Sequence, residues 1–350
     1  MDKLPFKENW GETEYFLRRW WTGERLLRPA ISITAPRPQR VPVPRPADLE
    51  TWRTDSDFVL RETRVMYQNT YFCAEAIPAR TLMVGYAVLG GEPHFDANTV
   101  WHSPTIHDWR TDATKRYDWN NPWWLNTKKI VSVLTEREVG FPPMPAILTP
   151  LDALSTMRGP QQLCTDLLTE PQTVKKYSAY LIGIWIEMFD QLYEITCTKY
   201  EGSTGWLTVW APGKYSTIQC DFSCMISPAM FEEFVLPEVE ALCNHLDFTI
   251  YHLDGPGALQ HLDALLRVPK LHGIQWVPGS GAAPAIEWTE LLRKVQNAGK
   301  RLHISLDNAR VQRALKDLSP EGLYLATSCA TMQEADELFA FVKSRCRSPI

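Results

Sequence analysis

Short runs of β-branched and aromatic residues in the second half of the chain end in side chains that can do chemistry. The clearest case is His252 and Asp254, which come directly after the run at residues 248–251. Residues two apart in a strand point to the same side, so this imidazole and this carboxylate can hold one metal ion. A thiol from a later strand, Cys329, can complete the set. The spacing predicts a metal centre of His252, Asp254 and Cys329, with zinc as the expected ion.

Other polar side chains follow neighbouring strands in the same way. Asp221 and Asp307 each stand at the end of such a run, and we predict that they orient a substrate or act as a general acid. Gln275 and Trp276 end another run and are predicted to shape the substrate pocket. The carboxyl ends of parallel strands meet on one face, which is where these groups are expected to gather.

Each of these residues also has a plain structural explanation. Aspartates after strands often cap the helices that follow them, and cysteine is a small side chain that packs well in a core. His252 can donate to Asp254 or to a backbone carbonyl. The recurrence of such groups at five consecutive strand ends is what favours a functional site.

Fourteen tryptophans give the chain an unusually aromatic composition, and several stand early in the sequence. Burial in the core is the simpler explanation, because each ring removes a large apolar area from water. The alternative is an aromatic wall around a ligand, built by the tryptophans of the N-terminal region. In the histidine-containing loop at residues 92–109, we expect Trp101 and His102 to contact the substrate.

The elements that must position these residues alternate regularly. After a long helix predicted over 172–197, strands at 217–221, 248–252, 271–276, 302–306 and 323–327 are each followed by a helix. A further strand is predicted over 205–210 and a helix over 113–121. The alternation implies a parallel sheet, and a chain of 350 residues without a GxGxxG or P-loop motif favours a TIM-type (β/α)8 barrel over an open sheet. We therefore expect a single α/β barrel domain over residues 1–350, with an elaborated N-terminal region over 1–70.

Composition restricts the partners. The net charge is -5 and no basic stripe is present, which argues against nucleic acid as a partner. No window is apolar over the roughly 20 residues that a membrane helix needs, and the N-terminus does not read as a secretory signal. Eight scattered cysteines fit reduced thiols. The expected protein is cytoplasmic and soluble; a homodimer stays open.

Three stretches resemble a known family. They read QCDFSCMISPAMFEEFVLPEVEAL at 219–242, YHLDGPGALQHLDALLRVPKLHGIQWVPG at 251–279 and LYLATSCATMQEADEL at 323–338. Together they resemble the uroporphyrinogen decarboxylase-like superfamily, and within it the corrinoid-associated, cobalamin-dependent methyltransferase-like branch. The resemblance implies a (β/α)8 barrel with its active site at the C-terminal mouth.

The resemblance also implies a zinc site with one departure. The branch holds zinc through a His-x-Cys pair and a later cysteine, whereas this chain reads His252-Leu253-Asp254 with Cys329. A site with one thiolate is harder than one with two and suits an oxygen or nitrogen substituent. Decarboxylation of a haem-pathway substrate is not expected, because the arginine-containing N-terminal segment of the true decarboxylases is missing.

The function that follows is a zinc-assisted methyl transfer from a small methylated O- or N-substrate to cob(I)alamin. No DxHxxG cobalamin motif occurs in the chain, so the cobalamin would be supplied in trans by a corrinoid protein. Two other classes stay open. One is a metal-free decarboxylase or lyase that acts on a small carboxylated substrate, and the other is a non-catalytic paralogue that binds a ligand or a corrinoid protein.

Overall fold

A seven-stranded, mostly parallel sheet lies at the centre of the computed structural model, which describes residues 4–82, 92–97, 99–112, 116–142 and 144–345. The strand order is β2-β1-β11-β10-β9-β8-β7, and every neighbouring pair is parallel except β1 with β2. The strands of this sheet are β1 (Ala30–Pro36), β2 (Thr70–Ala74), β7 (Tyr215–Gln219), β8 (Phe248–Asp254), β9 (Gly273–Val277), β10 (Arg301–Ser305) and β11 (Leu323–Ser328). Two small hairpins, β3 (Pro93–Phe95) with β4 (Val100–His102) and β5 (Ser203–Thr204) with β6 (Trp210–Ala211), form separate two-stranded sheets.

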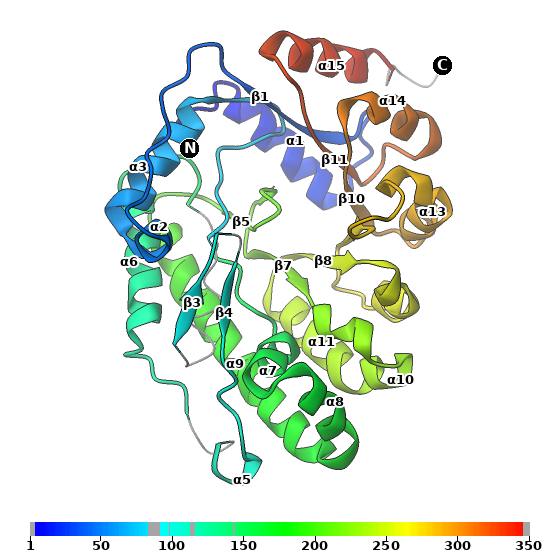
Figure 1. The fold of residues 1–350 in the computed structure, drawn as a ribbon. Helices are drawn as coiled ribbons and strands as arrows, with labels where there is room; N and C mark the ends of the chain where they lie inside the picture. Colours follow the sequence, from blue (N-terminus) through cyan, green and yellow to red (C-terminus); the bar gives the residue numbers. More distant parts are fainter. Residues whose placement is uncertain (1–3, 83–91, 98, 113–115, 143, 346–350) are drawn as a thin grey trace.

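Helices connect the strands and cover the sheet (Figure 1). Those of the first part are α1 (Trp10–Thr22), α2 (Leu49–Thr54), α3 (Ser56–Gln68), α5 (Trp109–Asp112), α6 (Pro122–Glu136), α7 (Pro150–Arg158), α8 (Pro160–Thr169) and α9 (Pro171–Thr196). Those of the second part are α10 (Pro228–Met230), α11 (Leu236–His245), α12 (Leu262–Leu266), α13 (Thr289–Asn297), α14 (Asn308–Asp317) and α15 (Met332–Arg345), with a π-helical turn at Phe231–Val235 between α10 and α11. In Figure 1 the second set follows one side of the molecule from yellow-green to red.

The regular alternation of strand and helix after residue 214 confirms the predicted βα pattern. Strands β8 to β11 lie within two residues of the expected positions, and α9 matches the long helix predicted before them. The strands of this sheet are mostly buried, as is usual for parallel strands covered by helices. The architecture is thus α/β with a parallel core.

Closure of the sheet is incomplete among the described residues, since no hydrogen-bonded strand pairing joins β7 to β2. In the part of the chain between β2 and β7, an isolated parallel bridge pairs Ala79 with Phe141. The amide of Ala146 also donates to the carbonyl of Leu82 over 3.3 Å. The hydroxyl of Thr149 donates to the carbonyl of Gln219 at the end of β7.

The N-terminal ends of the parallel strands are closed by α1 and its aromatic side chains, a region that we call the floor (Trp20, Trp21, Tyr215, Arg301 and Tyr324). The Trp20 indole donates to the carbonyl of Leu323 over 3.2 Å, and the Trp21 indole donates to the carbonyl of Trp210 over 2.8 Å. Both tryptophans are buried. These two rings therefore pack the end of the sheet where the strands begin, and they cannot wall a substrate at the other end.

Two local predictions are wrong. Residues 205–209 form a turn between β5 and β6, and only Trp210 of the predicted span lies in a strand; the Thr208 amide donates to the Gly205 carbonyl over 2.9 Å, and Thr208 has a φ of 54°. Of the helix predicted over 113–121, residues 113–115 lie outside the described residues and 116–121 are not helical. The helix begins instead at Pro122, where Asn121 caps it by accepting from the amide of Trp123 over 2.8 Å.

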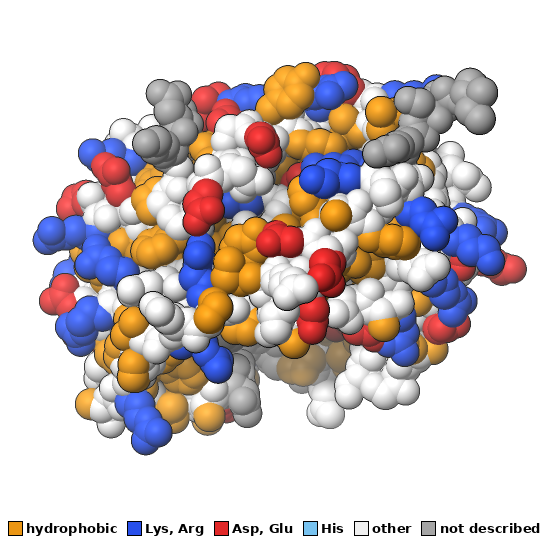
Figure 2. All heavy atoms as spheres, turned by 90° about the horizontal axis from the view of Figure 1, so that it is seen from above, with side chains coloured by type: hydrophobic (Ala, Val, Ile, Leu, Met, Phe, Trp, Pro, Cys, Tyr) orange, Lys and Arg blue, Asp and Glu red, His pale blue; other side chains and the backbone are white. Residues whose placement is uncertain are grey.

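The surface carries mixed charge. Figure 2 views the molecule from above and shows acidic and basic side chains alternating with hydrophobic ones across that face. Among the helices of the described residues, none is long and apolar enough to cross a membrane.

Candidate metal centre

Three side chains with metal-binding atoms meet at the C-terminal ends of β7 and β8. Asp221, His252 and Asp254 each offer one ligand atom, and these atoms lie within 4.8 Å of one another. His252 and Asp254 come from β8, and Asp221 begins the turn that follows β7. The pairing of Gln219 with His252 in the β7–β8 register brings the two strand ends level. We call this end of the sheet the mouth (Gln219, Asp221, His252, Asp254 and Gln275).

The ring of His252 is held by Gln275 on the next strand. The two residues are direct partners in the β8–β9 register, and His252 Nδ1 lies 2.6 Å from Gln275 Oε1. An amide oxygen only accepts, so Nδ1 donates to it, and Nε2 is the ring nitrogen left to face a cation. Metal-binding histidines usually have their second nitrogen fixed by such a partner. The ring is therefore prepared to bind a cation through Nε2.

Asp221 is held at its side chain and its backbone. Gln219 Nε2 donates to Asp221 Oδ2 over 2.9 Å. The buried carboxylate of Asp152, on α7, accepts from the amides of Asp221 and Phe222, each over 2.9 Å. These contacts fix the turn after β7, so the position of the Asp221 carboxylate is set by α7 as well as by its own strand.

The two aspartates at the mouth are exposed, and the charges around them affect their protonation. Partial burial raises the pKa of Asp221; His252 opposes this shift, and the neighbouring Asp254 carboxylate adds to it. Burial also raises the pKa of Asp152 to about 6, and the nearby Asp221 adds to that shift. Two carboxylates that repel each other gain from a shared cation. The donor set of two carboxylate oxygens and one imidazole fits a divalent metal ion, zinc or manganese among them.

Trp206 lies against this centre, and sequence reasoning missed it. Its ring centroid is 4.8 Å from that of His252, with the two planes at 77°. The residue stands in the turn between β5 and β6, where the sequence favours a strand by its β-branched and aromatic residues. The signal that could have found it is Gly205, which breaks the strand pattern.

Cys329 lies apart from the cluster. Among the described residues, the group of ligand atoms around His252 includes Asp221 and Asp254 but not the Cys329 thiol. This thiol is buried, burial raises its pKa, and Asn308 Nδ2 lies 3.9 Å from its sulfur. The residue whose ligand atom lies near those of His252 and Asp254 is Asp221. A role of Cys329 as a metal ligand stays a prediction.

Asp307 has a clear structural contact. Its carboxylate caps α14 by accepting from the amide of Arg310 over 3.1 Å, and it also pairs with the Arg310 guanidinium. This is the capping arrangement that the sequence offered as the plain explanation. A catalytic role for Asp307 stays a prediction.

The predicted substrate contacts are spread over several places. Gln275 joins the mouth, whereas Trp276, the next residue along β9, is buried and packs on Trp288 at 5.2 Å between ring centroids. Successive side chains of a strand point to opposite faces, so Trp276 faces the helices. Trp101 is 52% exposed and stacks on His94. His102 is buried, and this burial together with the nearby His94 lowers its pKa to about 4.

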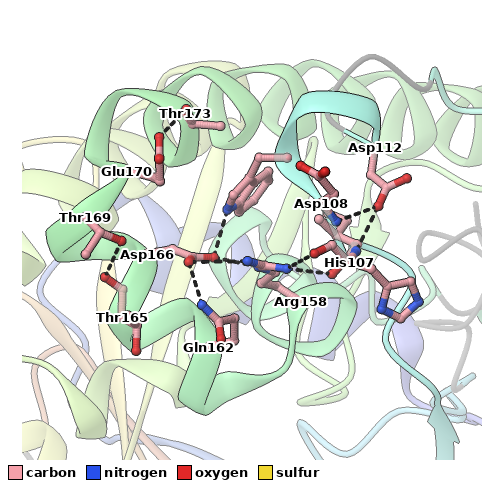
Figure 3. Close-up of polar contacts among 12 residues, drawn as sticks. His107, Asp108, Asp112, Arg158, Gln162, Thr165, Asp166, Thr169, Glu170 and Thr173 are labelled. Carbon is pink, nitrogen blue, oxygen red and sulfur yellow. Dashed lines mark hydrogen bonds and ion pairs between the residues drawn. The ribbon is translucent and has the colours of Figure 1, made fainter.

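A separate polar network holds the segment before and through α5 against α7 and α8 (Figure 3). Arg158 donates to the carbonyl of His107 over 2.7 Å and to Asp166 over 2.6 Å. The Trp109 indole and Gln162 also donate to Asp166. The buried carboxylate of Asp166 is thus fully paired, and these bonds keep its pKa low although burial alone would raise it. The network is a structural brace.

Comparisons with known proteins show the fold. No family model and no curated protein matches the chain. A solved structure described as a methyltransferase from Methanosarcina mazei is similar, with a TM-score of 0.60 and 13% sequence identity over 95% of this chain and 98% of that one. At this identity, the similarity establishes the shared fold alone.

Proposed function

We propose that the protein is a methyltransferase that uses a zinc ion held by Asp221, His252 and Asp254. The observation that carries the proposal is the convergence of these three ligand atoms within 4.8 Å at the ends of β7 and β8. The shared fold with a methyltransferase supports the reaction class, since that structure and this chain cover almost the whole of each other. When bound, zinc supplies Lewis acidity toward the heteroatom that carries the methyl group.

The residues of the chain have distinct parts in this reaction. Gln275 keeps the His252 lone pair directed toward the aspartates, and Gln219 keeps the Asp221 carboxylate in place. The substrate is a small O- or N-methylated compound, and the acceptor is the cob(I)alamin of a separate corrinoid protein. In this transfer the electron pair of cobalt(I) would form the new bond to the methyl carbon, which would make the cobalt Co(III). The bond from methyl carbon to heteroatom would break with its electron pair on the heteroatom, which would take a proton from water and leave hydroxide.

The proposal also includes closure of the sheet into a (β/α)8 barrel. The bridge between Ala79 and Phe141 and the bond from Thr149 to the end of β7 support it, because they join segments that lie in sequence between β2 and β7. In such a barrel the mouth would be the place of chemistry, in agreement with the position of the three ligand atoms.

Metal content tests the proposal directly. Protein purified without chelators is analysed by mass spectrometry for the wild type and the His252→Ala, Asp254→Asn and Cys329→Ala variants. We expect about one zinc ion per chain in the wild type, loss in His252→Ala and Asp254→Asn, and retention in Cys329→Ala, because only the first two remove a member of the cluster.

Methyl transfer is then assayed with cob(I)alamin, whose visible absorption changes on methylation. A wild type without metal would contradict the zinc centre. Loss of zinc in Cys329→Ala would indicate that Cys329 is a zinc ligand. A zinc-loaded protein that methylates cobalamin from none of the simple O- and N-methyl donors would contradict the methyltransferase function and leave a metal-dependent lyase or a binding protein.

A further inference from the structure

The β5–β6 hairpin carries one half-buried aromatic ring to the metal centre. Its strands are buried, and Val209 and Trp210 have no exposed surface. Trp206, at the turn, is only half-buried, and it packs its ring against His252 at 4.8 Å. Trp206 is therefore a half-exposed aromatic ring against a member of the candidate metal centre, where it can contact a molecule bound there.

The turn is built to hold this ring in place. A Cβ atom on Gly205 would lie 3.1 Å from the Tyr215 ring and 3.3 Å from the Thr217 hydroxyl, so the turn presses closely on β7. Thr208 adopts a φ of 54°, which a β-branched residue rarely does. Strain of this kind concentrates at functional sites. The hydroxyl of Thr81 also donates to the Trp206 carbonyl over 3.2 Å.

We propose that Trp206 is a specificity-determining residue that forms the apolar wall of the substrate site, and that the substrate is a neutral O-methyl compound. The inference rests on the proposed function and names its substrate class. The wall would pack against the methyl group or an aromatic ring next to it, while the ether or alcohol oxygen faces the centre formed by His252 and the two aspartates.

The charge of the proposed metal centre favours a neutral substrate over a methylammonium ion. Two carboxylates, Asp221 and Asp254, balance the charge of one divalent cation, and the imidazole of His252 adds a nitrogen donor without negative charge. Gln219 and Gln275 contribute uncharged amides. A cationic substrate would then meet a zinc ion without spare negative charge, which removes the attraction that an aromatic cage otherwise offers a cation.

The test measures binding and metal content on the same zinc-loaded protein. Isothermal titration calorimetry with anisole and, separately, with tetramethylammonium is carried out on the wild type, Trp206→Ala, Trp206→Phe and the neighbouring control Leu207→Ala. We expect the wild type to bind anisole more tightly than tetramethylammonium. Anisole affinity should fall about tenfold in Trp206→Ala, the loss expected for one well-packed ring contact, and recover in Trp206→Phe. Leu207→Ala should match the wild type, and zinc content should be equal in all four.

The outcomes separate the inference from the proposed function. Equal anisole affinity in Trp206→Ala and the wild type, or no anisole binding to the wild type, would contradict the role of Trp206 as the apolar wall of the substrate site. Tighter binding of tetramethylammonium would overturn the neutral class, and loss of zinc in Trp206→Ala would show that the ring supports His252 and does not contact substrate. If the protein holds no zinc but binds anisole in a way that depends on Trp206, the proposed zinc-dependent function is wrong and the role of Trp206 in substrate binding is retained.

Discussion

The floor and the mouth are the two ends of the same parallel strands, and they differ in how their side chains are satisfied. At the floor the aromatic rings are buried and the indole nitrogens of Trp20 and Trp21 each donate to a backbone carbonyl. At the mouth Asp221 and Asp254 are exposed, and neither forms an ion pair with a lysine or arginine of the described residues. The polar groups of the floor are paired within the protein and stabilise the fold. The carboxylates of the mouth remain accessible to a ligand, an arrangement that favours function over stability.

The largest expected effect tests the floor. Trp21 packs on Tyr215 and Phe248 with centroid distances of 5.3 and 4.9 Å, and it is buried. Trp21→Ala should lower the free energy of unfolding by about 3–5 kcal/mol, because it leaves a cavity and an unpaired carbonyl on Trp210. Urea unfolding measures this loss. Zinc affinity of the folded fraction should stay at the wild-type value, and a parallel loss of zinc affinity would show that the two ends are not independent.

The converse test is a substitution at the mouth. Gln275→Leu removes the acceptor that fixes His252 Nδ1 and should weaken zinc binding by about 10- to 100-fold, as the loss of such supporting contacts typically does. Competition with a chromophoric chelator measures the affinity. Gln275→Glu is the matched control, since its carboxylate still accepts from Nδ1 and should retain zinc. Unchanged affinity in Gln275→Leu would mean that the ring is held by Trp206 alone.

Part of the mouth could be predicted from the sequence, because the ends of strands and the spacing of residues are local properties. The positions of His252 and Asp254 two apart on one strand are enough to place both at the mouth. The direction of a side chain beyond the strand end depends on packing, which is why the sequence alone did not show that Asp221 lies within 4.8 Å of His252 and Asp254. Trp206 was missed because the span 205–210 has strand-forming residues, and only the close approach of Gly205 to β7 makes it a turn.

His303 lies on β10 between the two ends of the sheet, and its burial makes the stability of the protein depend on pH. It pairs in register with Gln275 and Tyr324, stacks on the Tyr324 ring, and is buried, so its pKa is lowered to about 3. The unfolded chain takes up a proton near pH 6.5 and the folded one does not, so His303 makes the protein less stable as the pH falls from about 6.5 toward 3.

Replacement by a ring that does not titrate isolates this effect. The loss of stability on moving from about pH 6.5 to about pH 5.5 should be smaller in His303→Phe than in the wild type, by roughly 1 kcal/mol. Urea unfolding at the two pH values measures it. An equal slope in both proteins would show that His303 is protonated in the fold or reached by water.

The smallest expected effect concerns Asp307, and it tests whether this residue has a structural role, like the floor residues, or a catalytic one. Asp307 caps α14, so Asp307→Ala should cost about 1 kcal/mol of unfolding free energy, and Asp307→Ser should restore most of it because serine also caps a helix. Methyl transfer separates the two roles. A residue that only caps the helix leaves the rate of Asp307→Ser at the wild-type value, whereas a general acid loses activity in both variants, since serine cannot supply the proton. We expect the first result, because the Asp307 carboxylate already pairs with Arg310 and its hydrogen-bonding capacity is committed to α14.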